Sequence, residues 1–167
     1  VIDSYGRYSA DSGLELNNVT YGRVTGTEID DALVGGFYYT NYTIPNGTPD
    51  VTWDNCRAAI TGSLGSSAYG CGWYLPAGSD GKASGGDFVI SNSTYTRSAS
   101  SVSTFGAAVT MFGAQRSLTL VNDDFSWLNA NVDLGSARLV DLAPSDDFRL
   151  NVRGARLTLT GTRSRGA

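Results

Sequence analysis

Apolar and polar residues alternate with a period of two along most of this chain, and no window shows a helical period with capping residues. The clearest run is near the end, where Phe148, Leu150 and Val152 are separated by polar residues. Such alternation is typical of a β-sheet that packs one face on a core and leaves the other in water. Acidic residues are nearly all Asp, which favours turns over helices. The sequence therefore predicts an all-β protein.

Turn residues divide the chain into short segments. Clusters of Gly, Pro, Asn and Asp recur at 35–36, 45–47, 78–81, 85–86 and 143–146. Roughly eight to eleven short strands with this spacing favour a single antiparallel β-sandwich or jelly-roll domain. A β-solenoid is the minor alternative, because the strands after Ser117 are closely spaced but no fixed repeat length emerges.

The chain has 167 residues, enough for one domain with a sizeable core. We expect the β-sandwich to span residues 13–160. Residues 1–12 are polar with interspersed tyrosines. We expect them to form either an arm that pairs with a neighbouring subunit or a flexible terminus. Residues 161–167 read as a flexible tail.

The chain contains two cysteines, Cys56 and Cys71, separated by a Gly/Ser-rich segment. We expect a disulfide between them, which would stabilise the fold by ~3 kcal/mol through chain entropy. Two unpaired buried thiols are the alternative. A disulfide would agree with secretion, as would a first residue, Val1, that is not Met and suggests a processed product.

Four Asn-x-Ser/Thr sequons are candidate glycosylation sites in a host with that machinery. They are Asn18, Asn41, Asn46 and Asn92. Together with the predicted disulfide they favour a secreted or extracellular surface location, and each sequon is weak evidence because the chain is rich in Asn, Ser and Thr.

The chain contains no histidine and a single lysine, Lys82. A Ser-His-Asp triad, a Cys-His pair and a histidine-ligated zinc site are therefore excluded within this polypeptide. Gly-x-Ser-x-Gly, Gly-x-Gly-x-x-Gly and P-loop motifs are also missing. The run 129–133 resembles a calcium loop but lacks its glycine and distal glutamate. We predict no metal and no cofactor.

Three acidic pairs occur, at 30–31, 123–124 and 146–147. Carboxylates from different pairs could serve glycoside hydrolysis if the fold brought them together. Neighbours in an extended segment point to opposite faces, so one pair alone is a poor catalytic unit. We interpret these residues as turn-flanking aspartates and predict that the protein is not an enzyme, with a carboxylate-based glycoside hydrolase as the alternative.

Aromatic residues gather around the two cysteines. We expect Trp53 and Trp73 to pack in the core. We expect Tyr38, Tyr42 and Tyr74 to lie on the opposite, more solvent-exposed faces, where they could bind a sugar ring or a protein.

Charge and hydropathy limit the partners. The net charge of −4 argues against nucleic acid, and no apolar run approaches the ~18 residues of a membrane-inserted segment. Low charge and high Ser, Thr, Gly and Asn content favour a non-enzymatic structural subunit of a surface assembly such as a pilus, fibre, sheath or capsid-like coat. Its partner would be the protein itself, joined by strand exchange. The alternative is a secreted module that binds carbohydrate or a cell surface through the tyrosine face.

Overall fold

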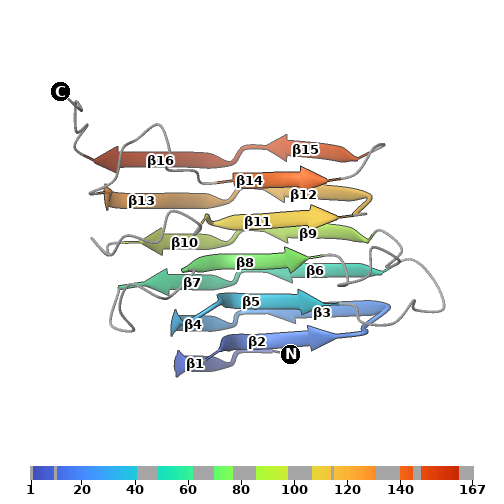
Figure 1. Ribbon diagram of the computed structural model, residues 1–167, viewed down its shortest axis with the longest axis horizontal. Helices are drawn as coiled ribbons and strands as arrows, with labels where there is room; N and C mark the ends of the chain where they lie inside the picture. Colours follow the sequence, from blue (N-terminus) through green and yellow to red (C-terminus); the bar gives the residue numbers. More distant parts are fainter. Residues whose placement is uncertain are drawn as a thin grey trace.

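The computed structural model describes residues 2–9, 11–40, 49–61, 70–76, 86–97, 107–113, 115–130, 140–144 and 148–161. In these ranges the chain winds into a parallel β-solenoid, in which each coil contributes one strand to each of three sheets (Figure 1).

The three sheets take every third strand of the chain. The first sheet contains β1 (Tyr5–Ser9), β4 (Glu28–Ala32), β7 (Arg57–Ile60), β10 (Thr94–Arg97), β13 (Asp124–Ala130) and β16 (Arg156–Gly161). The second contains β2 (Ser12–Asn17), β5 (Gly35–Thr40), β8 (Cys71–Pro76), β11 (Val109–Gly113) and β14 (Val140–Pro144). The third contains β3 (Tyr21–Thr25), β6 (Asp50–Asp54), β9 (Asp87–Ser91), β12 (Ser117–Val121) and β15 (Arg149–Arg153).

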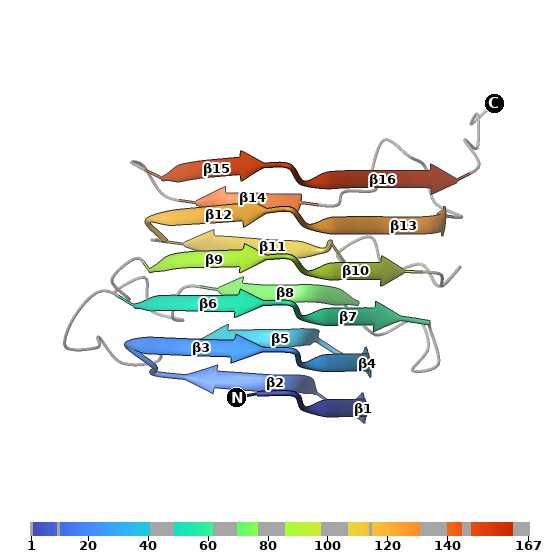
Figure 2. The ribbon, with the colours of Figure 1, turned by 180° about the vertical axis from the view of Figure 1, so that it is seen from behind.

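Strands of successive coils pair in parallel and in register, which the view from behind shows for the third sheet (Figure 2). In the first sheet Tyr95 lies opposite Ala58 on one side and Phe125 on the other. A position that faces the interior in one coil therefore faces it in the next, and each wall is built of rows of equivalent residues.

The core fills the lumen of the solenoid. Trp53 and Trp73 are fully buried, which confirms the prediction that both belong to the core. Trp73 stacks on Phe37 of the preceding coil with ring centroids 5.2 Å apart and reaches across the lumen to Phe125. Aromatic contacts of this kind add to the free energy gained from burying their area.

One corner of every coil is a two-residue turn between the third and the first sheet. Its first residue adopts positive φ, and this row contains Gly26, Asn55, Asn92, Asn122 and Gly154. Gly and Asn are the residues that tolerate this conformation best. Backbone hydrogen bonds link the row from coil to coil, including Asn55 N to Ser91 O and Asn92 N to Val121 O.

A second corner requires a small residue where the second sheet begins. A Cβ on Gly72 would lie 2.6 Å from the Ala108 oxygen and 2.7 Å from the Tyr95 ring. Gly36 occupies the equivalent position one coil earlier and faces Ala58. The first and second sheets can therefore approach closely at this edge.

The all-β prediction holds, but the antiparallel sandwich is wrong, because every sheet is parallel. A solenoid wall buries one face and exposes the other to solvent, as a sheet of a β-sandwich does. Alternation of apolar and polar residues alone therefore does not distinguish a solenoid from a sandwich. The arrangement has the form of the minor alternative, a β-solenoid.

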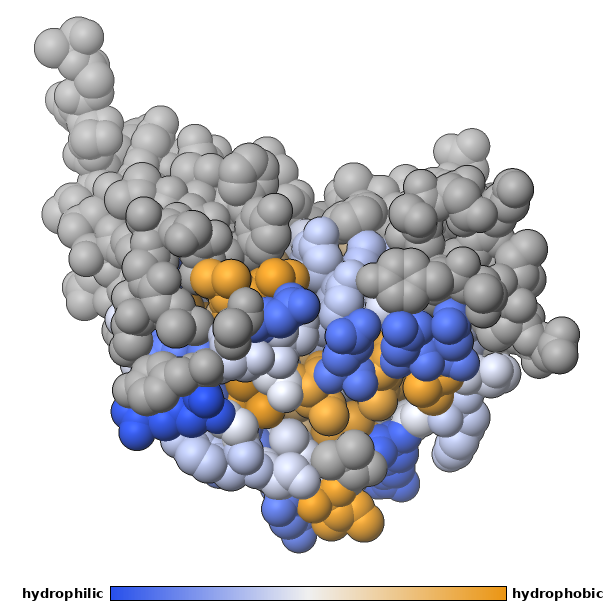
Figure 3. Space-filling model, turned by 60° about the horizontal axis from the view of Figure 1, so that its bottom comes forward, coloured by the Kyte–Doolittle hydropathy of each residue, from blue (hydrophilic) through white to orange (hydrophobic). Residues whose placement is uncertain are grey.

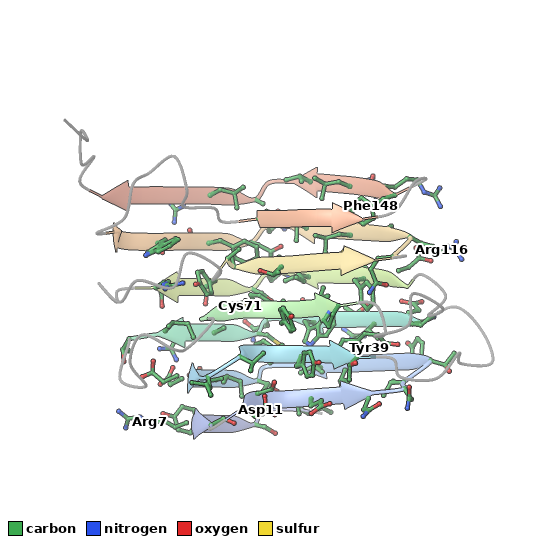
Figure 4. The ribbon with its side chains drawn as sticks, viewed as in Figure 1. Arg7, Asp11, Tyr39, Cys71, Arg116 and Phe148 are labelled. Carbon is green, nitrogen blue, oxygen red and sulfur yellow. The ribbon has the colours of Figure 1, made fainter. Side chains whose placement is uncertain are left out.

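The predicted disulfide is also wrong, because Cys56 and Cys71 are both buried and unbonded to each other. Cys56 is the second residue of the turn between β6 and β7, where its Sγ contacts the Val24 and Asp54 carbonyl oxygens. Cys71 begins β8 in the second sheet (Figure 4). Its Sγ lies 3.5 Å from Thr110 Oγ1. The two thiols belong to different walls of the coil, with β7 between them in the chain.

The ends of the chain contribute strands. Residues 2–9 contain β1, which pairs with β4, and residue 161 ends β16, which pairs with β13.

Substituting Asn55 tests the row of positive-φ residues at the corner between the third and the first sheet. Asn55→Ala should lower the free energy of unfolding by about 1–2 kcal/mol, because alanine resists positive φ, whereas Asn55→Gly should cost less. Chemical denaturation midpoints measure the difference. Equal losses in both variants would contradict the proposed role of backbone conformation.

Thiol titration tests whether Cys56 and Cys71 are free thiols. Both thiols should react with a disulfide reagent only after denaturation, because both are buried and burial raises the pKa of Cys56. Wild-type thermal stability should be the same with and without reductant. A loss of stability on reduction, or fewer than two free thiols in the denatured protein, would show that the two cysteines form a disulfide.

Candidate functional site: the outermost described coil

The last coil leaves its interior side chains half exposed. Leu150 and Val152 continue lumen rows whose previous members, Leu118 and Leu120, are at most 1% exposed. Leu150 and Val152 are themselves 47% and 50% exposed, and Leu157 on β16 is 48% exposed. This end therefore presents apolar surface from the same rows that form the core.

Arginines alternate with these apolar residues along β15. Arg149 and Arg153 are exposed on the outer face, with Asn151 between them. Among the described residues neither arginine makes an ion pair, whereas Arg156 on β16 pairs with Asp124 of the coil below. That contact raises the pKa of Arg156 and lowers the pKa of Asp124.

The strand edges at both ends lack a partner within the described ranges. β14, β15 and β16 are the outer strands of their sheets at one end, and β1, β2 and β3 at the other (Figure 1). The N-terminal end shows apolar atoms near its middle with hydrophilic atoms around them (Figure 3). Its partly buried apolar residues include Leu14, Leu16 and Val19. Unpaired edges offer backbone donors and acceptors to an added strand.

Two of the three candidate tyrosines meet on the outer face of the second sheet. Tyr38 and Tyr74 lie opposite each other on β5 and β8, with ring centroids 5.4 Å apart and planes at 22°. Both are half-buried, and the exposed Glu15 continues the row on β2. Because the rings stack on each other, neither offers both faces to a sugar. Tyr42 lies outside the described residues.

Each described member of the acidic pairs has a structural partner. Asp30 accepts a hydrogen bond from Arg57 at 2.9 Å and another from the Tyr5 hydroxyl at 3.1 Å. Asp31 is buried and accepts from the Thr61 amide at 2.7 Å. The pair 146–147 lies outside the described residues. These contacts give each of these two carboxylates hydrogen-bond partners within the fold.

The second turn position forms a row of small or polar side chains that includes Cys56, Ser93 and Asp123. Each is bonded to the next coil: Cys56 N donates to Ser93 Oγ at 3.0 Å, and Ser93 N donates to Asp123 Oδ1 at 2.9 Å. Asp123 Oδ2 also accepts from Val121 N at 3.0 Å. Burial raises the pKa of Asp123 to about 7, although both amide bonds favour the charged form.

A buried arginine lies in the lumen. Arg97 is 1% exposed, and its guanidinium carbon lies 4.3 Å from the centroid of the Trp127 ring. Tyr95 on the same strand donates its hydroxyl to the Gly70 carbonyl, and burial raises its pKa. The cation–π contact compensates part of the cost of burying the charge. Sequence analysis missed this residue, because an arginine after an alternating strand reads as solvent-facing.

Asn18 and Asn92 are exposed residues with positive φ, while Asn41 and Asn46 lie outside the described residues. The Asn92 amide already donates to Asp54 Oδ1 at 2.9 Å, and Asn122 donates to Asn92 Oδ1 at 3.4 Å. A glycan at Asn92 would take one of the two hydrogens of this amide nitrogen. Glycosylation stays a prediction.

The part of the chain that the structure describes contains no group of three or more His, Cys, Asp or Glu side chains that could hold a metal ion. It also contains no helix long and apolar enough to cross a lipid bilayer. Comparisons with protein-family models, curated proteins and solved structures found no match.

Sequence analysis placed Leu150 and Val152 on a core face, and the structure places both in lumen rows. It did not predict that both side chains would be about half exposed. Periodicity reports which face a residue shares but not whether another coil covers it.

Replacing Asp123 tests the buried carboxyl. Between pH about 4 and about 7 the folded protein keeps this proton and the unfolded chain loses it, so wild-type stability should fall as the pH rises through that window. Asp123→Ser, which copies Ser93, should remove the dependence, a change on the order of 3 kcal/mol between the two pH limits. Urea unfolding across the pH range measures it.

Asp124→Ser is the matched control, because Arg156 holds the pKa of Asp124 below its usual range. In that variant the free energy of unfolding should depend on pH between pH 4 and 7 as it does in the wild type. An unchanged slope in Asp123→Ser would show that Asp123 is ionised throughout.

Proposed function

We propose that this chain is a non-enzymatic structural subunit of an extended surface assembly, joined to further copies of itself through the outermost strands of the described solenoid. The observation that carries the proposal is the half-exposed set Leu150, Val152 and Leu157. Their partners in the preceding coil, Leu118, Leu120 and Phe125, are at most 1% exposed. Covering apolar surface of this kind drives association.

The wall geometry supports strand addition as the joining mode. Backbone bonds between coils run in both directions, as in Asp3 N to Thr25 O and Glu28 N to Ser4 O. An outer strand thus presents both donors and acceptors, and an added strand would extend a sheet that is already five or six strands wide. The extracellular surface location remains part of the proposal.

A carbohydrate- or cell-surface-binding module is the second candidate. The Tyr38–Tyr74 stack beside the exposed Glu15 favours it, because aromatic edges, hydroxyls and a carboxylate can contact a sugar. Loss of glycan-array binding in Tyr38→Ala, with retention in Tyr21→Ala on another wall, would support this candidate.

Sedimentation velocity and negative-stain imaging over a wide concentration range test the structural proposal. Wild type should form elongated multimers. Leu150→Asp should weaken their association by tenfold or more, because it places a charge in the apolar surface to be covered. A wild-type monomer at every concentration would contradict the proposal.

Asn151→Asp is the control on the same strand, because it adds the same charge on the outer face. It should retain assembly. Equal loss in both variants would mean that charge, and not coverage of the lumen end, controls association.

A further inference from the structure

The outer face of the third sheet divides into an acidic half and a basic half. Along β6 and β9 the side chains on this face include three carboxylates and no cation; they are Asp50, Thr52, Asp54, Asp87, Val89 and Ser91. Along β12 and β15 they include two guanidinium groups and no carboxylate; they are Ser117, Thr119, Val121, Arg149, Asn151 and Arg153. Figure 2 shows these four strands one above the other. The charge on this face therefore changes sign along the axis of the solenoid.

The register places opposite charges in the same rows of this face. Asp50 and Arg149 belong to one row, and Asp54 and Arg153 belong to another. In both rows the carboxylate lies on β6 and the guanidinium on β15, with β9 and β12 between them. The midpoint of both rows therefore lies between β9 and β12.

A second copy of the chain matches these rows when it lies face to face with the first and its coils run in the reverse order. The two-fold axis of this pair is parallel to the strands and passes between β9 and β12, so β6 of one copy faces β15 of the other. Asp50 then lies opposite Arg149, and Asp54 lies opposite Arg153. The symmetry forms each of these pairs twice. Near the axis Val89 lies opposite the uncharged Thr119, and no charge on the four strands meets a like charge.

The charged groups are available for such a contact. Among the described residues, Asp50, Arg149 and Arg153 make no ion pair, and all three are exposed. A hydrogen bond from Asn92 lowers the pKa of Asp54, so this carboxyl is ionised at neutral pH.

The same charges disfavour the other two-fold arrangement of this face. With the two-fold axis along the solenoid, each strand would face its own copy. Arg149 would then lie opposite Arg153, and Asp50 would lie opposite Asp54. Like charges directly opposite each other are destabilising, and repulsion in one arrangement selects the other.

The size of the face limits the strength of the contact. Four strands of five residues cover about 17 Å by 19 Å. This is well below the roughly 800 Å² that each partner buries in a stable interface. Exposed ion pairs are also individually weak and are screened by salt. We therefore expect a weak dimer that is sensitive to ionic strength.

We propose that the outer face of the third sheet is an interface with a second copy of this chain, packed face to face with its coils in reverse order. This inference goes beyond the end-to-end joining proposed above, because it uses the side of the solenoid. It requires no contact at the outermost strands.

Sedimentation velocity at protein concentrations up to about 1 mM tests this interface, because a small contact area needs that range. Wild type should show a reversible monomer–dimer equilibrium, and the dimer should weaken as salt is added. Asp50→Arg and Arg149→Asp should each weaken dimerisation about tenfold or more, because each replaces two attractive pairs by two repulsive ones. A wild-type monomer at every concentration would overturn the inference.

Asp11→Arg is the matched control, because it makes the same change of charge at an exposed residue between β1 and β2. It should dimerise as the wild type does. Loss of dimerisation in Asp11→Arg equal to that in Asp50→Arg would mean that net charge, and not this face, controls association.

Exchanging the two charges tests the reversed packing directly. An equimolar mixture of Asp50→Arg and Arg149→Asp should recover the wild-type association, and so should the double variant Asp50→Arg/Arg149→Asp. In both cases opposite charges again meet at each of these contacts. Both residues are exposed, and thermal unfolding checks that each variant keeps its fold. Failure of both the mixture and the double variant to recover association would contradict the reversed packing.

This proposal and end-to-end joining fail in different ways. Elongated multimers that Asp50→Arg leaves unchanged would uphold end joining and reject the third-sheet interface. Dimers that the exchanged charges restore, with no longer species at any concentration, would uphold the interface and contradict end joining.

Discussion

Each strand from β1 to β13 hydrogen-bonds to the strand three elements later in the chain, and this parallel register governs the other features of the structure. It aligns the lumen rows, so Phe37 meets Trp73 and Leu118 meets Leu150. It places a positive-φ residue at the same corner of each coil. It also sets the outer rows, in which Glu28 faces Arg57 and Asp124 faces Arg156. Leu150 and Val152 of the last described coil continue these rows, and both side chains are about half exposed.

Much of the strand content could be predicted from the sequence, because alternation of apolar and polar residues reports burial of one face. The topology could not, because the same alternation serves a sandwich sheet and a solenoid wall. Two local patterns carried the missing information. The first is a Gly, Asn or Asp with positive φ, followed by one more turn residue, before each strand of the first sheet, as at Asn92-Ser93. The second is a small residue before the first apolar position of strands in the second sheet, as at Gly72-Trp73. The turn residues recur at intervals of 23, 29, 37, 30 and 32 residues from Asp3 to Gly154, so no constant period reveals them.

The candidate site was predictable only in part. Leu150 and Val152 belong to the core face that their alternation indicates, and Arg149 and Arg153 belong to the outer face. Their meaning as a site depends on which strand lies at the edge, and this is a property of the whole stack. The disulfide was wrong for a related reason. Cys56 and Cys71 are close in sequence, but Cys56 lies in the turn between β6 and β7 and Cys71 lies at the start of β8 in the second sheet.

The hydrogen bonds between coils run along the axis of the solenoid, and this orientation determines how the molecule responds to mechanical load. Tension along the axis opens the bonds of one outer coil at a time and leaves the rest of the stack intact. The coil from Asn92 to Asn122 holds 30 residues. Unwound, it extends to about 100 Å, whereas one coil adds only about 4.8 Å to the stack. A chain built in this way lengthens by peeling from its ends, so the strength of an axial assembly depends on how firmly its terminal coils are held.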